Sequence, residues 1–158
     1  MIKKVVIAAA GYGTRMLQLT KNKPKHLIYV QNHPFLYYLL SNLKKAGLKE
    51  MILVVGYQKE AMEEFQEKYK KEFPLTIIDQ FAIFGKEKYG TAIPLWCVKE
   101  IIGKENFLMV FGDNLYSPKD ISSLLINDNY HYISVIPNPH PEKYGVVVTQ
   151  GELLVKIV

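Results

Sequence analysis

The amino-acid sequence predicts an α/β protein with a mostly parallel, Rossmann-like sheet that is covered by helices on both faces. Short apolar runs of strand length alternate with segments of helical periodicity. The run 51–56 is apolar throughout its length, as is usual for a strand buried on both faces. A glycine-rich loop also follows the first apolar run directly. Strands that alternate with long helices form βαβ units, and these build a parallel sheet.

The first two thirds of the chain supply the regular elements of this sheet. The predicted strands are residues 5–9, 51–56, 75–78 and 107–111. The predicted helices are 34–47, 59–71 and 91–102, and residues 80–90 are predicted to form a polar loop. The first helix begins with Pro34, which suits a first turn, and ends at Gly47. The second helix is charged, with apolar residues at spacings of three and four on one face.

After Asp120 the alternation changes. Further strands are predicted at 132–136, 146–149 and 153–158, with a proline-rich break at 137–141. The last of these reaches the end of the sequence without a helix to cover it, so we expect a C-terminally incomplete fold. A length of 158 residues nevertheless predicts one domain over 1–158.

Composition restricts the partners that the protein is expected to have. The net charge of +5 comes from lysines spread along the chain, without the interleaved aromatic residues of a nucleic-acid surface. The single cysteine, Cys97, excludes an intrachain disulfide and a cysteine-based zinc cluster. The N-terminal apolar stretch is too short for a signal peptide or a membrane span. We therefore expect a cytoplasmic protein that binds neither nucleic acid nor membranes; its oligomeric state stays open, a homo-oligomer included.

The glycine-rich loop contains the only arginine of the chain, Arg15. A planar guanidinium binds phosphate oxygens through two parallel hydrogen bonds, which an ammonium group cannot do. A second cation, Lys25, follows a proline that restricts the backbone before it. A strand, a small-residue turn and a cation together favour a phosphate site at the carboxyl end of the sheet, although the loop alone could be a structural turn.

Asp113 follows an apolar strand and Gly112, so it is expected at the same edge of the sheet. A functional carboxylate at the edge where α/β sites assemble is one interpretation, and a turn aspartate is the other, because Gly-Asp-Asn is a common turn composition. His26, which stands beside Lys25, is expected to be structural.

Six segments together resemble the sugar-1-phosphate nucleotidyltransferases, also called sugar-nucleotide pyrophosphorylases. The first is 11–16 with Thr20 and Pro24-Lys25, and the second is 32–34, which is followed by a helix that ends in 46–48. The other four are 54–57, 90–92, 111–114 and 144–147. Their order extends over most of the chain. The resemblance implies a fold of the glycosyltransferase-A-like type and an enzyme of sugar-nucleotide synthesis. Such an enzyme uses Mg²⁺ to transfer a nucleotidyl group from a nucleoside triphosphate to a sugar-1-phosphate, with release of pyrophosphate. UTP or dTTP is favoured over ATP or GTP, and glucose-1-phosphate is the default sugar.

The resemblance also implies roles for individual residues. Arg15 and Lys25 would be catalytic and Asp113 would bind Mg²⁺. Tyr144 and Gly145 would contact the sugar phosphate. The nucleotide would be bound by Ala9, Ala10, Gly11, Gly13 and Thr14 around its phosphates, and by Gln80, Gly90 and Thr91 around its base. Gln80 and Gly90 are ten positions apart, which exceeds the family spacing, so Gln80 could equally be a loop residue.

Two alternatives remain beside the transferase. Family members usually continue past this sequence and supply there a Glu-Lys-Pro segment and a second acidic metal ligand, so turnover by these 158 residues is in question. A non-catalytic module that binds a nucleotide or sugar nucleotide is therefore the alternative. A dinucleotide-dependent oxidoreductase is disfavoured, because Met16 stands where the dinucleotide fingerprint needs its third glycine.

Overall fold

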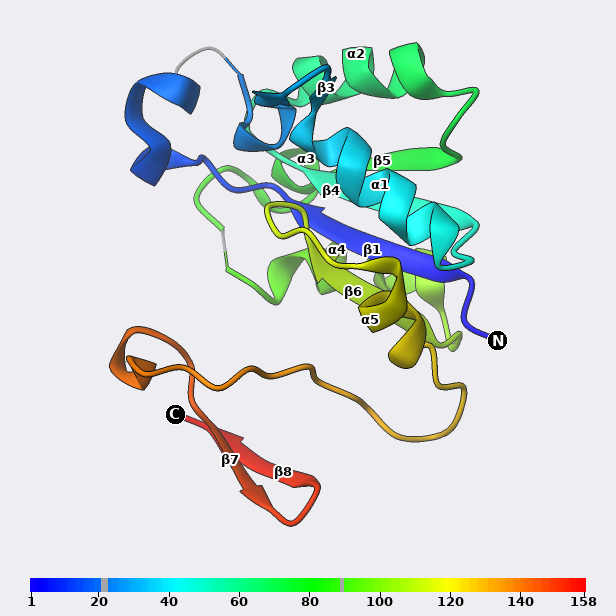
Figure 1. Ribbon diagram of the computed structural model, residues 1–158. Helices are drawn as coiled ribbons and strands as arrows, with labels where there is room; N and C mark the ends of the chain where they lie inside the picture. The colour runs from blue at the N-terminus through cyan, green and yellow to red at the C-terminus, as the bar shows by residue number, and fades with distance from the viewer. Residues whose placement is uncertain (21–22, 89) are drawn as a thin grey trace. The chain divides into compact units, whose positions relative to one another are not determined.

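The computed structural model describes residues 1–20, 23–88 and 90–158, without the side chains of Arg15, Leu17 and Leu19, and contains the predicted α/β sheet (Figure 1). Its contacts divide into two compact units, Met1–Asp128 and Asn129–Val158. Each unit is described by itself below. One domain over the whole chain stays a prediction.

The first unit contains six strands, five α-helices and two 3₁₀ helices among its described residues. In chain order these are β1 (Lys4–Ala9), the 3₁₀ helices η1 (Thr14–Thr20) and η2 (Lys25–Leu27), β2 (Tyr29–Val30), β3 (His33–Pro34), α1 (Phe35–Lys45), β4 (Glu50–Val55), α2 (Lys59–Tyr69), β5 (Leu75–Asp79), α3 (Gln80–Phe84), α4 (Ile93–Ile102), β6 (Phe107–Phe111) and α5 (Pro118–Ser123).

Four of these strands form one parallel sheet in the order β5-β4-β1-β6. Lys4 of β1 lies in register with Glu50 of β4 on one side and with Phe107 of β6 on the other. Because all four strands run in the same direction, their carboxyl ends lie along one edge of the sheet (Figure 1). The loops that follow the four strands therefore begin at the same edge. β2 and β3 form a separate antiparallel pair.

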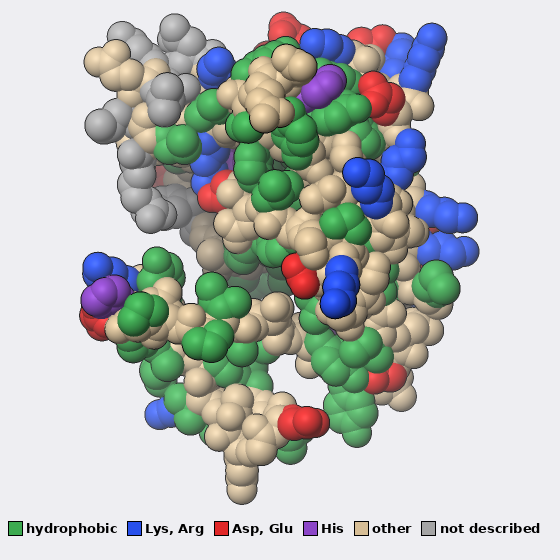
Figure 2. Space-filling model, in the orientation of Figure 1, with side chains coloured by type: hydrophobic (Ala, Val, Ile, Leu, Met, Phe, Trp, Pro, Cys, Tyr) green, Lys and Arg blue, Asp and Glu red, His purple; other side chains and the backbone are tan. Residues whose placement is uncertain are grey.

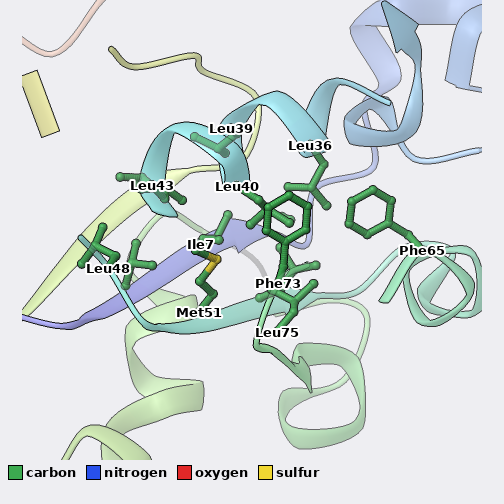
Figure 3. Packing of buried hydrophobic residues seen from close by; sticks show 14 of the residues in the cluster. Ile7, Leu36, Leu39, Leu40, Leu43, Leu48, Met51, Phe65, Phe73 and Leu75 are labelled. Carbon is green, nitrogen blue, oxygen red and sulfur yellow. The ribbon is translucent and has the colours of Figure 1, made fainter. Parts of the chain in front are cut away.

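Alternate residues of each strand are buried on opposite faces of the sheet. Val5 and Ile7 of β1 belong to a core that is shared with α1, α2 and α5, whereas Val6 packs with α4. Figure 3 shows the leucines of α1 lying over Ile7 and Met51. The side chains of Leu36, Leu39, Leu40 and Leu43 are fully buried. Burial of each stabilises the fold by about 1.5–3 kcal/mol relative to an exposed side chain. The predicted helical cover on both faces is thus confirmed.

The end of α1 shows how sequence fixes a boundary. Gly47 has φ +96°, and its N–H donates to the carbonyl of Lys44, while the N–H of Leu48 donates to the carbonyl of Leu43. This is the Schellman arrangement, in which a left-handed residue satisfies the last carbonyls of a helix. Leu43 and Leu48 are both buried, which supplies the hydrophobic contact that accompanies it.

The prediction of a loop over 80–90 is wrong at its start, because residues 80–84 form α3. The Oδ1 atom of Asp79 accepts hydrogen bonds from the N–H groups of Phe81 and Ala82, at 2.9 and 3.0 Å. An N-cap of this kind stabilises a short helix that has too few residues to show a periodic pattern. The helix predicted from residue 91 also begins two residues later, at Ile93.

The second unit contains the 3₁₀ helix η3 (Pro141–Lys143) and a hairpin of β7 (Val147–Gln150) and β8 (Leu153–Ile157). The N–H groups of Val146 and Val158 each donate to the carbonyl of the other, at 2.7 and 2.9 Å. The prediction of a strand over 132–136 is wrong, since these residues have no ladder. A strand needs a neighbour for its backbone groups, and in this unit β7 and β8 use each other.

Charged side chains are mixed on the surface. Figure 2 shows lysine side chains over several elements of the visible face, with acidic side chains among them. None of the helices in the described part of the chain has the length and apolar character that crossing a membrane would require.

Candidate functional site

The predicted site residues of the first unit gather in the loops at the carboxyl edge of the sheet. Loops begin there at Ala10, Gly56 and Gly112, immediately after β1, β4 and β6, and helix α3 begins at Gln80, immediately after β5. In α/β proteins this edge is where ligands bind. The parallel sheet thus places the starts of these segments at one edge, and a site formed there by the predicted residues stays a prediction.

The glycine-rich loop after β1 has one position that requires glycine. Gly13 has φ +68°, and a Cβ atom there would lie 3.2 Å from Cγ2 of Thr20. The carbonyl of Gly13 accepts hydrogen bonds from the Met16 N–H at 2.9 Å and from Oγ1 of Thr20 at 3.0 Å. Gly11 differs, because no other group of the described residues lies within 4 Å of the place where its Cβ would be. The conformation of the loop is therefore fixed by contacts at Gly13, whereas there is space for a larger side chain at Gly11.

Arg15 lies in η1, within this loop region. Its side chain is outside the part of the chain that the structure describes. The predicted phosphate contact of Arg15 stays a prediction.

Lys25 and Asp113, which are 88 positions apart in sequence, form an ion pair with 2.5 Å between Nζ and Oδ2. Lys25 is the first residue of η2, directly after Pro24, and Asp113 follows β6. Both side chains keep access to solvent, with 23% of the lysine and 44% of the aspartate exposed. The structure thus brings together the predicted second cation and the predicted metal ligand.

The environment keeps Asp113 ionised. Partial burial raises its pKa, but the hydrogen bond and positive charge of Lys25 outweigh burial, so the pKa lies below its usual value. A carboxylate at neutral pH is the form that binds a divalent cation.

His26 is buried beside this pair, with 1% of its surface exposed. Burial, with a further contribution from the charge of Lys25, lowers the pKa of His26 to about 4 against the opposing effect of Asp113. Neither ring nitrogen has a hydrogen-bond partner among the described residues. A Cβ atom on Gly112 would lie 3.0 Å from the His26 ring and 3.1 Å from the carbonyl of Ala8. The neutral ring therefore packs where only a glycine leaves room.

On the other side of the site, Gln80 is almost fully buried at the start of α3, with 2% of its surface exposed. Its Nε2 donates to the carbonyl of Lys88 at 3.3 Å. Gln80 and Gly90 are ten positions apart, and this bond holds Gln80 to Lys88, two positions before Gly90. Gly90 has φ +153°, and both it and Thr91 are exposed. Direct contact of these three residues with a base stays a prediction.

Sequence reasoning missed an aromatic cluster, which consists of Tyr12, Tyr57 and Phe81. These residues follow β1, β4 and β5, three neighbouring strands. The ring of Tyr12 lies 5.5 Å from the rings of both Tyr57 and Phe81. Its hydroxyl donates to the carbonyl of Lys86 at 3.2 Å. The available signal was an aromatic residue within two or three positions of each strand end.

The residues predicted for the sugar phosphate belong to the second unit. Tyr144 is 64% exposed, and its N–H donates to the carbonyl of Pro141 at 3.0 Å. A Cβ atom on Gly145 would lie 3.1 Å from Cγ2 of Ile157. Their contact with a sugar phosphate stays a prediction.

Asp113 is the one residue predicted to bind Mg²⁺. Across residues 1–20, 23–88 and 90–158, no group of three or more histidine, cysteine or acidic side chains could hold a metal ion by itself. Mg²⁺ is often bound by one or two carboxylates together with substrate phosphates. Asp113 fits that kind of shared site.

Comparison with known proteins gives a consistent result. A family model described as nucleotidyl transferase matches residues 4–157. A protein of Methanocaldococcus jannaschii, provisionally named a UTP–glucose-1-phosphate uridylyltransferase, is 32% identical over 169 residues, which cover 93% of this chain and 60% of that protein.

Two solved structures extend the comparison. A UDP-glucose pyrophosphorylase complexed with UDP-glucose matches with a TM-score of 0.62 and 26% identity, over 78% of this chain and 53% of that one. The CTP:phosphocholine cytidylyltransferase of Streptococcus pneumoniae matches with a TM-score of 0.55 and 32% identity, over 75% and 50%. The chain thus spans 60% of the Methanocaldococcus protein's length.

Proposed function

Because this chain belongs to the nucleotidyl transferase family, we propose that it transfers the nucleotidyl group of a nucleoside triphosphate to a sugar-1-phosphate. An oxygen of the sugar phosphate forms a bond to the α-phosphorus, the bond to the bridging oxygen breaks, and pyrophosphate leaves. UTP or dTTP and glucose-1-phosphate are the proposed substrates. The names of the Methanocaldococcus relative and of the UDP-glucose pyrophosphorylase support UTP and glucose-1-phosphate.

The observation that carries this proposal is the ion pair of Lys25 and Asp113 beside the glycine-rich loop. Phosphoryl chemistry asks the protein mainly for positioning and for neutralisation of charge. Without a ligand, the two side chains neutralise each other. With a bound triphosphate, Lys25 would turn to the phosphates, and Asp113 would hold Mg²⁺ together with phosphate oxygens. The bound Mg²⁺ would neutralise charge on the triphosphate.

The other predicted residues take the roles that fit their positions. Arg15 would contact the triphosphate. The loop of Ala9, Ala10, Gly11, Gly13 and Thr14 would surround its phosphates. Gly90 and Thr91 would lie against the base, and Gln80 would act from the interior by holding the segment before Gly90. Tyr144 and Gly145 would contact the sugar phosphate.

Calorimetry with UTP, dTTP, CTP, ATP and GTP, with and without Mg²⁺, tests the nucleotide site. We expect Mg²⁺-dependent binding of UTP or dTTP that is lost in Asp113→Asn and weakened in Lys25→Met. Glu100→Gln removes an exposed carboxylate from α4 and should bind as the native chain does. Equal binding by Asp113→Asn and the native chain would contradict the proposed metal role.

Release of pyrophosphate from UTP and glucose-1-phosphate then separates an enzyme from a binding module. The second candidate is a module that binds nucleotide without turnover, and it is favoured because no group of three or more metal-binding side chains lies together among the described residues. Mg²⁺-dependent binding with pyrophosphate release supports the transferase. Binding of UTP without release supports the module.

A further inference from the structure

We infer that Tyr12 is a positioning residue that ties the glycine-rich loop to residues 85–88 and so couples the phosphate side of the site to the base side. The inference rests on the proposed function in assigning phosphates to the first loop and a base to Gly90. The tie itself rests only on contacts of Tyr12.

The first contact is the packing of the Tyr12 ring. It lies against Tyr57 and Phe81, with ring centroids 5.5 Å apart in each case. Phe81 in turn covers Gly56, where a Cβ atom would come within 2.8 Å of the Phe81 ring and 3.0 Å of the Ala10 carbonyl. Aromatic pairs at this separation and tilt attract each other beyond their buried area. The ring of Tyr12 is therefore held by residues that follow the two neighbouring strands.

The second contact is the hydrogen bond from the Tyr12 hydroxyl to the carbonyl of Lys86. Two further interactions hold the same segment from other elements. Nε2 of Gln80 donates to the carbonyl of Lys88, and Nζ of Lys88 lies 5.3 Å from the centre of the Phe84 ring and 5.7 Å from that of Trp96. The contacts of Gln80 and Lys88 link residues 85–88 to α3 and α4. The hydroxyl of Tyr12 links the same residues to the glycine-rich loop.

This arrangement matters because of how the segment is bounded. Gly85 has φ +80° and Gly90 has φ +153°, which glycine adopts readily because it has no Cβ. Gly85 is held to α3 by a hydrogen bond from its N–H to the carbonyl of Phe81, and beyond it residues 86–88 are held to other elements through side-chain contacts. A nucleotide that contacts both loops would depend on the distance that Tyr12 maintains between them.

Tyr12→Phe removes the hydroxyl and keeps the ring. Tyr38→Phe is the matched control, since the Tyr38 hydroxyl also donates to a backbone carbonyl, that of Val30 at 2.8 Å. The first readout is amide hydrogen exchange of residues 85–88 in the ligand-free protein. One hydrogen bond of this kind corresponds to about a threefold to tenfold change. We expect exchange to rise by that factor in Tyr12→Phe and to stay unchanged in Tyr38→Phe; unchanged exchange in Tyr12→Phe would overturn the tie.

The second readout compares UTP with inorganic triphosphate, both with Mg²⁺. UTP contacts both sides of the proposed site, and triphosphate contacts only the phosphate side. We expect Tyr12→Phe to lower the affinity for UTP about threefold to tenfold and that for triphosphate by less than about twofold. Equal losses for the two ligands, or no loss, would overturn the coupling.

The two readouts separate this inference from the proposed function. If the native chain binds neither ligand, the proposed nucleotide site fails, and hydrogen exchange still decides whether Tyr12 holds residues 85–88. If the native chain binds UTP and exchange does not change in Tyr12→Phe, the inference fails and the proposed function stands.

Discussion

Two groups of residues at the carboxyl edge of the sheet are held by different kinds of interaction. After β1 and β6, Lys25 and Asp113 form an ion pair next to a buried, neutral His26. After β4 and β5, aromatic rings and neutral hydrogen bonds hold residues 85–88. Partners in a half-exposed ion pair can be exchanged for those of a charged ligand, whereas packed rings keep a fixed geometry. We therefore expect the chemistry of the proposed function on the first side, called here the charged side, and positioning on the second, called here the aromatic side.

The largest expected effect is on turnover, in Lys25→Met. Removing one group that stabilises transition-state charge lowers kcat by about 100-fold to 1,000-fold. The free energy of unfolding should change by less than about 1 kcal/mol, because a solvent-accessible pair contributes little to stability. Pyrophosphate release and urea unfolding measure the two quantities. Lys104→Met, at an exposed position after α4, is the control and should change neither.

The next effect is on the pH dependence of stability and concerns His26. Above about pH 6.5 His26 is neutral in the folded and unfolded states. As the pH falls from about 6.5 to about 4, the unfolded chain binds a proton that the folded protein excludes. The free energy of unfolding should therefore decrease with a slope of about 1.4 kcal/mol per pH unit, or about 3 kcal/mol in total.

Urea unfolding of the native chain and of His26→Leu between pH 7.5 and pH 4 measures this contribution as the difference between the two slopes. His131→Gln changes an exposed histidine and should keep the native slope. Parallel curves for the native chain and His26→Leu would show that His26 is not held neutral in the fold.

A smaller effect, on stability, is expected from substitution of Gly112, which precedes Asp113. In Gly112→Ala the new methyl group would meet the His26 ring at 3.0 Å and the Ala8 carbonyl at 3.1 Å. Overpacking of this kind costs about 1–3 kcal/mol. Gly11→Ala is the comparison, since no other group of the described residues lies within 4 Å of its added methyl. It should change the free energy of unfolding by less than about 0.5 kcal/mol. Equal melting temperatures for the two variants would contradict the packing described at Gly112.

The charged side could be predicted from sequence in its members but not in its pairing. Lys25 and Asp113 stand out as charges beside a proline or a strand end, and the continuous apolar runs identify the parallel sheet that brings them to one edge. That they meet each other follows from β1 and β6 being neighbours, which the sequence does not state.

The aromatic side could not be predicted, for a related reason. Tyr12, Tyr57 and Phe81 lie far apart in the sequence, and only the order β5-β4-β1 places the segments that carry them side by side. Helix α3 depends on the cap at Asp79 and is too short for periodicity. The error at 132–136 has the same origin, because a strand pattern does not tell which neighbour will pair with it.

The smallest expected effect concerns Gln80, on the aromatic side. Gln80→Met keeps the length of the side chain and removes the bond to the Lys88 carbonyl. It also removes the buried Oε1, which has no partner among the described residues. Loss of the bond costs about 1 kcal/mol and removal of an unsatisfied oxygen returns part of it, so the free energy of unfolding should fall by less than about 1 kcal/mol. UTP affinity should fall more than triphosphate affinity, as in Tyr12→Phe. A loss of stability well above that amount, or an equal loss for both ligands, would place Gln80 in the general core and confine base positioning to Tyr12.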